Sequence, residues 1–348
     1  MSDAAPKIAV LGPGSWGTAL AILLARHGAD VALWGHDPAE VDALAHDREN
    51  RHYLPGIPLP DKLHPTTDLA AAIDGADEVL VVVPSFAFAE VVARVAALRP
   101  DIRSLSWATK GFDPASGQLL HQVARKLLPK THLAVVSGPT FAKEVAKGLP
   151  TAVTVAATDA EHAHRLAGYL HGDTFRAYTA DDIAGVEVGG AAKNVMAIAA
   201  GIADGLGFGA NARAALITRG LVEITRLGLK LGGEPETFMG LAGLGDLTLT
   251  CTDNQSRNRR MGLALAAGKS IDEARAEIGQ AVEGVGTARE VYQLAQQLDV
   301  DMPITEQTYR VLYEGLDPRQ AVINLLQRDP KAERPDDLDV PDDILDGG

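Results

Sequence analysis

The chain has 348 residues, a length that is typical of two domains rather than of one compact core. Its 46% hydrophobic and 22% charged residues are the balance of an ordinary soluble globular protein. The formal net charge of −14 argues against a nucleic acid as the main partner, and a single cysteine, Cys251, excludes an intramolecular disulfide, so we expect a cytoplasmic protein with an inert, structural thiol.

The first part of the chain alternates between short β-rich runs and apolar helices. Ile8–Leu11 is a predicted strand that stops at the sequence GPGSWG, and the helix that follows closes on Gly28, a typical C-cap. A second strand is predicted at 30–35, after which Asp37 and Pro38 are expected to be the N-cap and first-turn proline of the next helix. Further strands are predicted at 78–84, 104–111, 132–139 and 152–157, with helices at 88–98 and 118–128. This alternation predicts an α/β region with a doubly wound, Rossmann-like parallel sheet.

The composition changes after about Asp182, where β-rich runs stop and Ala-, Gly- and Leu-rich helical patterns cover 185–326. The sequence therefore predicts a dinucleotide-binding domain at 1–182 and an all-α domain for substrate and catalysis at 183–328. Residues 329–348 carry eight acids against two bases, so we expect a disordered, solubilising tail, with an interaction tail as the alternative. Neither a secretory signal nor a membrane-spanning run is predicted.

A glycine motif follows the first predicted strand. Gly12, Gly14 and Gly17 have the GxGxxG spacing, between a strand and a helix, which is the context that a dinucleotide-binding loop requires. The first glycine permits a tight turn, the second lets the backbone approach a pyrophosphate, and the third lets helix and strand pack closely. Ser15 and Trp16 lie at the helix N-terminus, whose free N–H groups favour an anion. The alternative is a glycine turn without a ligand.

The residues that would read the ribose lie at the end of the second predicted strand, in the sequence WGHDP. Asp37 could accept a hydrogen bond from the 2′-hydroxyl of NAD. His36 could instead lie beside the 2′-phosphate of NADP, although neutral imidazole holds a phosphate less well than arginine does. The sequence leaves this choice open.

Three further polar residues and a glycine occur in segments that are dense in functional residue types. Lys110 follows a predicted strand at its carboxyl end, where doubly wound sheets bind ligands. Gly138 and Thr140 follow the next strand, in a turn whose N–H groups could meet an anion. Asp246 stands between glycine-flanked apolar residues. The alternatives are an ordinary surface loop for Lys110 and a capped strand-to-helix turn for Gly138 and Thr140.

The sequence DNQSRNRR places Ser256, Arg257 and Asn258 at the expected start of a helix. Amides at a helix start together with a guanidinium form a phosphate site. A capping segment with a solvated basic turn is the alternative.

Lys193 stands alone among small and apolar residues in GVEVGGAAKNVMAIAAGI, which runs over 185–202. A lysine in such a setting is either a solvent-facing spacer or a proton donor held where water is scarce. The local sequence allows both interpretations.

Long segments of the chain resemble the bacterial NAD(P)-dependent sn-glycerol-3-phosphate dehydrogenases. The resemblance is carried by GPGSWGTALA, YLPG, ATKGF, SGPTFAKEVA, GVEVGGAAKNVMAIAAGIADGLGFGANARAALITRG and LAGLGDLTLTCTDNQSRNRR, with a weaker EGVGTA beyond them. It implies reduction of dihydroxyacetone phosphate to sn-glycerol 3-phosphate by NADPH or NADH, reversibly, without a metal, to supply the backbone of glycerophospholipids. Apart from the resemblance, the net charge already argues against a nucleic-acid partner, and the apolar helical domain leads us to expect a homodimer.

The resemblance assigns a role to residues of this chain that match the family's motifs. Lys193 matches the proton donor or acceptor. The residues that match substrate contacts are Lys110, Gly138, Thr140, Asp246, Ser256, Arg257 and Asn258. The residues that match cofactor contacts, besides the glycine motif, are Ser15, Trp16, Tyr53, Lys110, Ala142, Arg257, Ala281 and Glu283. His36 replaces the arginine that is common in the family, which weakens the expectation of NADPH preference, and Ala210 replaces an acid with little expected consequence.

Ordinary physical chemistry supports the implied mechanism. A lysine stripped of water has a lowered pKa and is a competent acid near neutral pH, whereas an ion pair with Asp246 would raise that pKa. Arg257 would hold the substrate's phosphate. The alternatives are a dehydrogenase of similar plan that acts on a 3-hydroxy acid or a sugar-acid phosphate, and a nucleotide-binding redox sensor without turnover.

Overall fold

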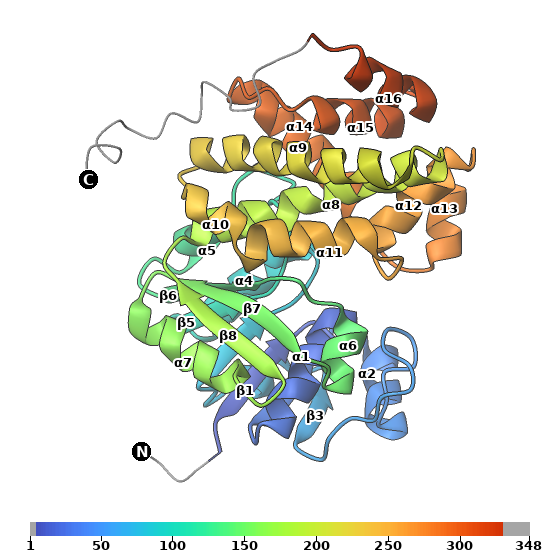
Figure 1. The fold of residues 1–348 in the computed structure, drawn as a ribbon. Helices are drawn as coiled ribbons and strands as arrows, with labels where there is room; N and C mark the ends of the chain where they lie inside the picture. The colour runs from blue at the N-terminus through green and yellow to red at the C-terminus, as the bar shows by residue number, and fades with distance from the viewer. Residues whose placement is uncertain (1–4, 330–348) are drawn as a thin grey trace.

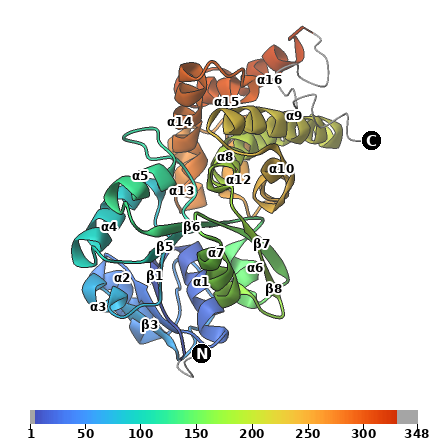
Figure 2. The same ribbon diagram turned by 90° about the vertical axis from the view of Figure 1, so that its left-hand side faces the viewer.

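The computed structural model describes residues 5–329. The predicted acidic tail, apart from Asp329, lies outside the described residues. Figure 1 shows a sheet with its flanking helices in the lower half of the molecule and a purely helical part above it. Figure 2 shows the same stacking from the side, with α15 and α16 farthest from the strands in both views.

The lower half is built on one eight-stranded sheet with the order β3-β2-β1-β4-β5-β6-β7-β8. The strands are β1 (Lys7–Leu11), β2 (Asp30–Trp34), β3 (Leu63–Thr66), β4 (Glu78–Val81), β5 (Ser104–Trp107), β6 (His132–Ser137), β7 (Thr151–Ala157) and β8 (Phe175–Ala180). The helices that connect them are α1 (Ser15–Arg26), α2 (Pro38–Asp47), α3 (Leu69–Ile73), α4 (Ser85–Leu98), α5 (Leu120–Leu127), α6 (Ala142–Lys147) and α7 (Ala160–Leu170). The chain order reverses between β1 and β4, which is where a doubly wound sheet binds its ligand. The predicted doubly wound fold is confirmed.

The sheet differs from the prediction at one side. β1 to β6 are parallel, as expected, but β7 pairs antiparallel with β6, and β8 then runs parallel to β7. The connection from β6 to β7 contains only the short helix α6, which packs against α1 rather than crossing the sheet as a full βαβ unit requires. The predicted parallel pairing is therefore confirmed for β1 to β6 and wrong only where β7 joins β6.

Two strands, β3 and β8, were not predicted, and both lie at an edge of the sheet. Most of their side chains are partly or fully exposed, so their sequences, LHPT and FRAYTA, lack the apolar run of a central strand. A central strand such as β4, buried at all its positions, shows that run clearly.

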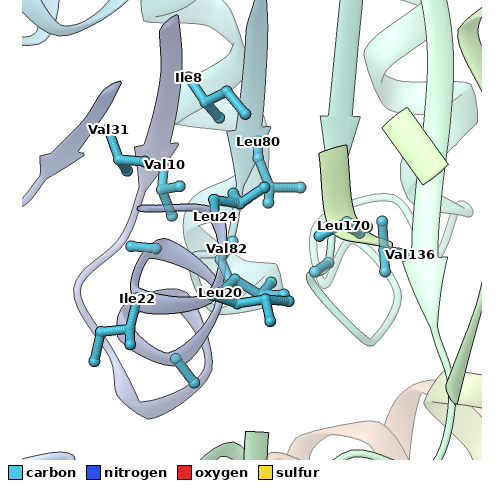
Figure 3. Close-up of a cluster of buried hydrophobic side chains, with 14 of the residues drawn as sticks. Ile8, Val10, Leu20, Ile22, Leu24, Val31, Leu80, Val82, Val136 and Leu170 are labelled. Atoms are coloured by element: carbon cyan, nitrogen blue, oxygen red, sulfur yellow. The ribbon is translucent and has the colours of Figure 1, made fainter. Parts of the chain in front are cut away.

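The strands at the switch point pack on α1. Figure 3 shows Val10 of β1 and Leu80 of β4 on the sheet, with Leu20 and Leu24 of α1 beside them. All four are 0–1% exposed, and each buried side chain of this kind contributes roughly 1.5–3 kcal/mol relative to an exposed one. This packing fixes the N-terminus of α1 directly after the glycine motif.

From Ile183 to Leu326 the regular elements are helical. They are α8 (Ile183–Gly205), α9 (Gly209–Lys230), α10 (Pro235–Met239), the π-helical turn η1 (Leu241–Gly245), α11 (Asp246–Thr252), α12 (Arg257–Ala266), α13 (Ile271–Ile278), α14 (Glu283–Gln297), α15 (Pro303–Tyr313) and α16 (Pro318–Leu326). Helix α8 contacts α9, α11, α12 and α14, and its first turns also contribute Ile183 and Val186 to a core that includes side chains of β1, β4, β5 and β6. The same helix thus belongs to both halves of the molecule.

Helix α8 has the length and mean hydropathy of a membrane span, and it is the one such helix among residues 5–329. However, 94% of its most apolar window is buried inside the protein. Its apolar sequence is therefore accounted for by its central position in the fold.

Candidate active site

Two lysines from opposite halves of the molecule share one buried carboxylate. Lys193 of α8 donates a hydrogen bond from Nζ to Oδ1 of Asp246, the first residue of α11. Lys110, which follows β5, donates from Nζ to Oδ2 of the same carboxylate at 2.6 Å and to the carbonyl oxygen of Gly138 at 3.2 Å. The side chains of Lys193, Lys110 and Asp246 are 9%, 14% and 1% exposed, so the charges face one another in a nearly dry space.

The close approach of α8 depends on its small residues. A Cβ added to Gly189 would lie 2.6 Å from the carbonyl oxygen of Ala242 in η1. A Cβ added to Gly190 would lie 2.7 Å from Oγ of Ser137, at the end of β6, and 3.7 Å from the side chain of Lys110. Glycines therefore let α8 lie against the carboxyl ends of β5 and β6, where the lysines meet.

Desolvation is the largest influence on the pKa of Lys193. Burial lowers the pKa of Lys193 to about 8, assisted by the nearby Lys110 ammonium and opposed by Asp246. The sequence had left open which influence would dominate. A lysine in this state retains its proton near neutral pH and can release it easily.

Thr250 and Asn194 contact predicted site residues and were not themselves predicted from the sequence. Thr250 Oγ1 lies 2.9 Å from Lys193 Nζ and donates to the backbone oxygen of Asp246, one turn earlier in α11. Asn194, the next residue after Lys193, is buried and accepts a hydrogen bond from Asn258 at 2.9 Å. The i, i+4 spacing of Asp246 and Thr250 was the available signal, because it places both side chains on one helix face.

The segment around Arg257 begins α12, as predicted. Ser256 is the N-cap, and its Oγ accepts from the backbone N–H of Arg259. Asn258 uses its amide group inside the protein, since Nδ2 donates to Asn194 and Oδ1 accepts from the N–H of Gly284 at 2.9 Å. Asn258 therefore joins α8, α12 and α14, and its contact with substrate stays a prediction.

The glycine motif has the shape that a dinucleotide needs. Gly12 has φ +118°, and a Cβ there would lie 2.7 Å from the carbonyl oxygen of Val82, whereas a Cβ on Gly17 would overlap Gly12 itself. A Cβ on Gly14 would meet nothing within 4 Å, so there is open space exactly at the start of α1. That helix has no side-chain cap, which leaves its first N–H groups to a ligand, and the buried Nε1 of Trp16 has no hydrogen-bond partner among residues 5–329. These features fit a bound pyrophosphate.

Tyr53 lies against this loop. Ser15 Oγ donates to the backbone oxygen of Tyr53 at 2.9 Å. The pKa of the Tyr53 phenol is raised by burial and by Glu40, and the positive charge of Arg257 acts against that rise. The contacts of Arg257 with substrate and cofactor stay predictions.

The ribose end is exposed and mixed in charge. Asp37 caps α2 as predicted, because Oδ1 accepts from the N–H groups of Ala39 and Glu40. Burial and the neighbouring Asp37 raise the pKa of Glu40, while His36 and His52 lower it. His36 thus stands near Asp37 and Glu40, whose negative charges oppose a 2′-phosphate, whereas the imidazoles of His36 and His52 do not.

The remaining predicted residues line the same region with fewer contacts. Thr140 Oγ1 donates to the backbone oxygen of Gly138 at 3.2 Å, and Ala142 begins α6. Glu283 begins α14, next to the N–H of Gly284 that binds Asn258, and Ala281 is exposed just before it. Within residues 5–329 none of these side chains forms a hydrogen bond or ion pair with Lys110 or Lys193, so their roles stay predictions.

The thiol of Cys251 forms no hydrogen bond with Lys110, Lys193 or Asp246 within the described residues. Cys251 is buried, and burial raises the pKa of its thiol to about 12, which agrees with a structural role. Residues 5–329 contain no group of three or more His, Cys, Asp or Glu side chains that could hold a metal ion.

Comparisons with known proteins agree over nearly the whole chain. The family models described as NAD-dependent glycerol-3-phosphate dehydrogenase N-terminus and C-terminus match residues 7–163 and 182–323. The glycerol-3-phosphate dehydrogenase (NAD(P)+) of Aeromonas salmonicida is 58% identical over 329 residues, which are 94% of this chain and 98% of that one. The protein of the same name from Stenotrophomonas maltophilia is 56% identical over 97% of this chain and 99% of its own length.

A solved structure shows the same likeness. The crystal structure of glycerol-3-phosphate dehydrogenase from Coxiella burnetii superposes with a TM-score of 0.91 at 50% identity. The alignment covers 93% of this chain and 99% of that one. Both halves of the fold, and not the sheet alone, are therefore shared.

Proposed function

The chain belongs to the NAD-dependent glycerol-3-phosphate dehydrogenase family, and from that premise we propose how its own residues carry out the reaction. It is an NAD(P)H-dependent oxidoreductase that reduces dihydroxyacetone phosphate to sn-glycerol 3-phosphate. When bound, the nicotinamide supplies the hydride. The protein has to hold both reactants, exclude water and deliver a proton to the carbonyl oxygen.

Lys193 delivers that proton. The observation that carries this proposal is its buried Nζ, held by Asp246 and Thr250 and shifted by burial to a pKa of about 8. In the reduction, the proton moves from the Lys193 ammonium to the carbonyl oxygen as the C2–H bond forms, and in the reverse reaction the neutral amine takes it back. Asp246 and Thr250 orient the amine of Lys193. Lys110 binds the other oxygen of Asp246, so the Lys110 ammonium also lies beside the proposed substrate position.

Arg257 binds the substrate's phosphate together with the first amides of α12. A guanidinium matches the geometry of a phosphate, and the N-terminus of a ten-residue helix adds unpaired N–H groups and a partial positive charge. Ser256 and Asn258 support this segment from either side. Gly138 and Thr140, beside Lys110, complete the proposed substrate contacts.

The glycine motif, with Ser15 and Trp16, holds the pyrophosphate at the start of α1. His36, Tyr53, Ala142, Ala281 and Glu283 are the further proposed cofactor contacts. In this proposal residues 1–182 bind the dinucleotide and residues 183–328 supply the catalytic lysine and the phosphate site. Either NADH or NADPH fits the mixed charges at the ribose end.

We also propose that the product supplies glycerophospholipid backbones, that the enzyme is a homodimer and that it resides in the cytoplasm. The proposed role in lipid synthesis follows from the chemistry of sn-glycerol 3-phosphate, which is itself the glycerol backbone of a glycerophospholipid. The helical half exposes Met239 and Leu326 to 65% and 74%, respectively, and such side chains are candidates for burial against a second copy. Sedimentation of the purified protein would test the dimer.

Oxidation of NADH and of NADPH, measured in parallel at 340 nm with dihydroxyacetone phosphate, tests the proposed function. We expect turnover with this substrate and little with 2- or 3-keto acids of similar size that lack a phosphate. The substitution Arg257→Ala should mainly raise KM for dihydroxyacetone phosphate. Equal rates with unphosphorylated substrates, or an unchanged KM in Arg257→Ala, would contradict the proposed phosphate site.

A further inference from the structure

A buried carboxylate that the mechanism does not use lies on the catalytic helix. Glu187 is in α8, its side chain is 2% exposed, and it lies six residues before Lys193, or about 9 Å along the helix axis. A charged carboxylate in such a position is costly unless polar groups surround it. The contacts of Glu187 therefore need an explanation.

Glu187 accepts hydrogen bonds from two elements of the sheet half. Oε1 accepts from the indole Nε1 of Trp107 at 3.1 Å and from the backbone N–H of His121 at 3.0 Å. Oε2 lies 2.6 Å from Nδ1 of the same histidine. Burial raises the pKa of Glu187, while His121 and Trp107 act against that rise. One carboxylate is thus satisfied by three groups that all come from the other half of the molecule.

Both partners are placed where they can affect the active site. Trp107 is the last residue of β5, is fully buried against Phe88, and stands three residues before Lys110. His121 lies in the first turn of α5, which follows the loop after Lys110. Glu187 therefore holds both ends of the segment that carries Lys110.

Helix α8 connects Glu187 to the lysine pair through its next two turns. Gly190, one turn after Glu187, lies against Ser137 and the Lys110 side chain, and Lys193 follows on the next turn. Lys110 and Lys193 bind opposite oxygens of Asp246, and both hydrogen bonds depend on how closely β5 and α8 lie together. Packing at Gly190 sets how near the two elements can come, but a glycine contact cannot by itself fix their sliding or rotation.

We propose that Glu187 is a positioning residue for the reaction: by binding Trp107 and His121 it fixes the carboxyl end of β5 against α8, so that Lys110 and Lys193 share Asp246. This inference rests on the proposed function. Glu187 does not touch the reacting atoms, and its effect is on the alignment of the proton donor with the substrate. A misplacement of about 1 Å in such an alignment can cost about 100-fold in rate.

The test compares Glu187→Ala with Glu187→Gln. The alanine variant leaves the three donors without their acceptor, and we expect kcat for dihydroxyacetone phosphate to fall about tenfold to 100-fold. We expect the dissociation constant of NADH, from fluorescence titration, to change less than threefold, and the isotope effect with 4-deuterated NADH to increase. Glutamine can accept from Trp107 and the His121 N–H and donate to Nδ1, so Glu187→Gln should keep kcat within about threefold of the wild type.

Glu223 provides a matched control. It is equally buried, in α9, and it accepts three hydrogen bonds, from the backbone N–H groups of Ile304 and Thr305 and from Thr305 Oγ1. Its partners belong to α15, which takes no part in the lysine pair. We expect Glu223→Ala to lower the melting temperature while the folded enzyme keeps its kcat within about twofold.

The outcomes separate the two proposals. An inactive wild type would contradict the proposed function, whereas an active wild type with an equally active Glu187→Ala would overturn only the role of Glu187. The role is also overturned if Glu187→Gln is as slow as Glu187→Ala.

Should Glu187→Ala not fold, the variant His121→Ala decides, because it removes a half-buried side chain and keeps the backbone N–H donor. A severalfold lower kcat at unchanged NADH affinity supports the proposal, and wild-type kcat overturns it.

Discussion

The nucleotide-binding end and the lysine site of this protein are built in opposite ways. The nucleotide end uses the absence of side chains: Gly12, Gly14 and Gly17 are near in sequence and create a turn, an open space and a close helix contact. The lysine site uses charges from distant parts of the chain, with Lys110 and Lys193 meeting at a buried Asp246. Local backbone geometry determines the first, and desolvation by the assembled fold determines the second.

This difference has a practical lesson for reading such proteins. A glycine loop works wherever the strand and helix around it form, so changes to its residues should affect nucleotide binding or local stability and leave the lysine site in place. A buried charge cluster depends on several elements at once, so its residues affect catalysis most strongly. The following predictions test that contrast.

Removing the ammonium should have the largest effect. Lys193→Met keeps a long apolar side chain in the space beside Asp246 but cannot donate a proton, so we expect kcat to fall by about 10²–10⁴-fold. NADH binding, measured by fluorescence titration, should be nearly unchanged, because Lys193 is not part of the glycine loop. A Lys193→Met variant with the turnover of the wild type would contradict the view that the lysine site, and not the glycine loop, supplies the catalytic proton.

The pH dependence of kcat/KM should report the titration of Lys193. Because the pKa of Lys193 is lowered to about 8, the proton needed for reduction is present below that pH and is lost above it. We expect kcat/KM for dihydroxyacetone phosphate to fall about tenfold per pH unit well above 8, and the oxidation of sn-glycerol 3-phosphate to fall below it. The residual activity of Lys193→Met should lack this dependence, and a persisting transition near pH 8 would assign it to another group.

Two alanine substitutions should divide the roles of the glycine loop. Gly12→Ala places a Cβ 2.7 Å from the oxygen of Val82 at φ +118°, so we expect a loss of roughly 1–3 kcal/mol in the free energy of unfolding. Gly14→Ala meets nothing and has φ −65°, so stability in denaturant should be retained. KM for NADH should nevertheless increase about tenfold, or ~1.4 kcal/mol, in Gly14→Ala, because the Cβ enters the ligand's space. Normal cofactor binding in Gly14→Ala would show that the pyrophosphate does not lie beside Gly14.

The smallest effect is expected at the ribose end. His36→Arg adds a guanidinium beside an adenosine 2′-phosphate, but the site is exposed and Asp37 and Glu40 are close, so the gain is limited. We expect the ratio of kcat/KM for NADPH to that for NADH to rise about fivefold at low salt, and less at high salt. His36→Gln is the control. An unchanged ratio in His36→Arg would show that the 2′-phosphate does not lie near this residue.

Much of the local structure could be predicted from the chain alone. The glycine motif, the Asp37–Pro38 start of α2 and the Ser256 cap of α12 all occur where expected, because each depends on a few adjacent residues. The edge strands β3 and β8 were missed, and the antiparallel pairing of β7 was not foreseen, because exposed edges lack an apolar pattern and strand direction depends on the connection. Thr250 escaped notice for a related reason, since its partner Lys193 is far away in the sequence.

By itself, the sequence determined the glycine turn, the caps, the central strands and the apolar character of α8, since these follow from side-chain size, hydrogen-bonding capacity and hydrophobic period over a few residues. Only the tertiary structure decided that Lys193 is buried rather than solvated, that Lys110 and Asp246 stand beside it, and that Glu187 ties the two halves together. The physical reason is that an ionisable group takes its properties from water exclusion and from neighbouring charges, and both arise only when distant segments pack.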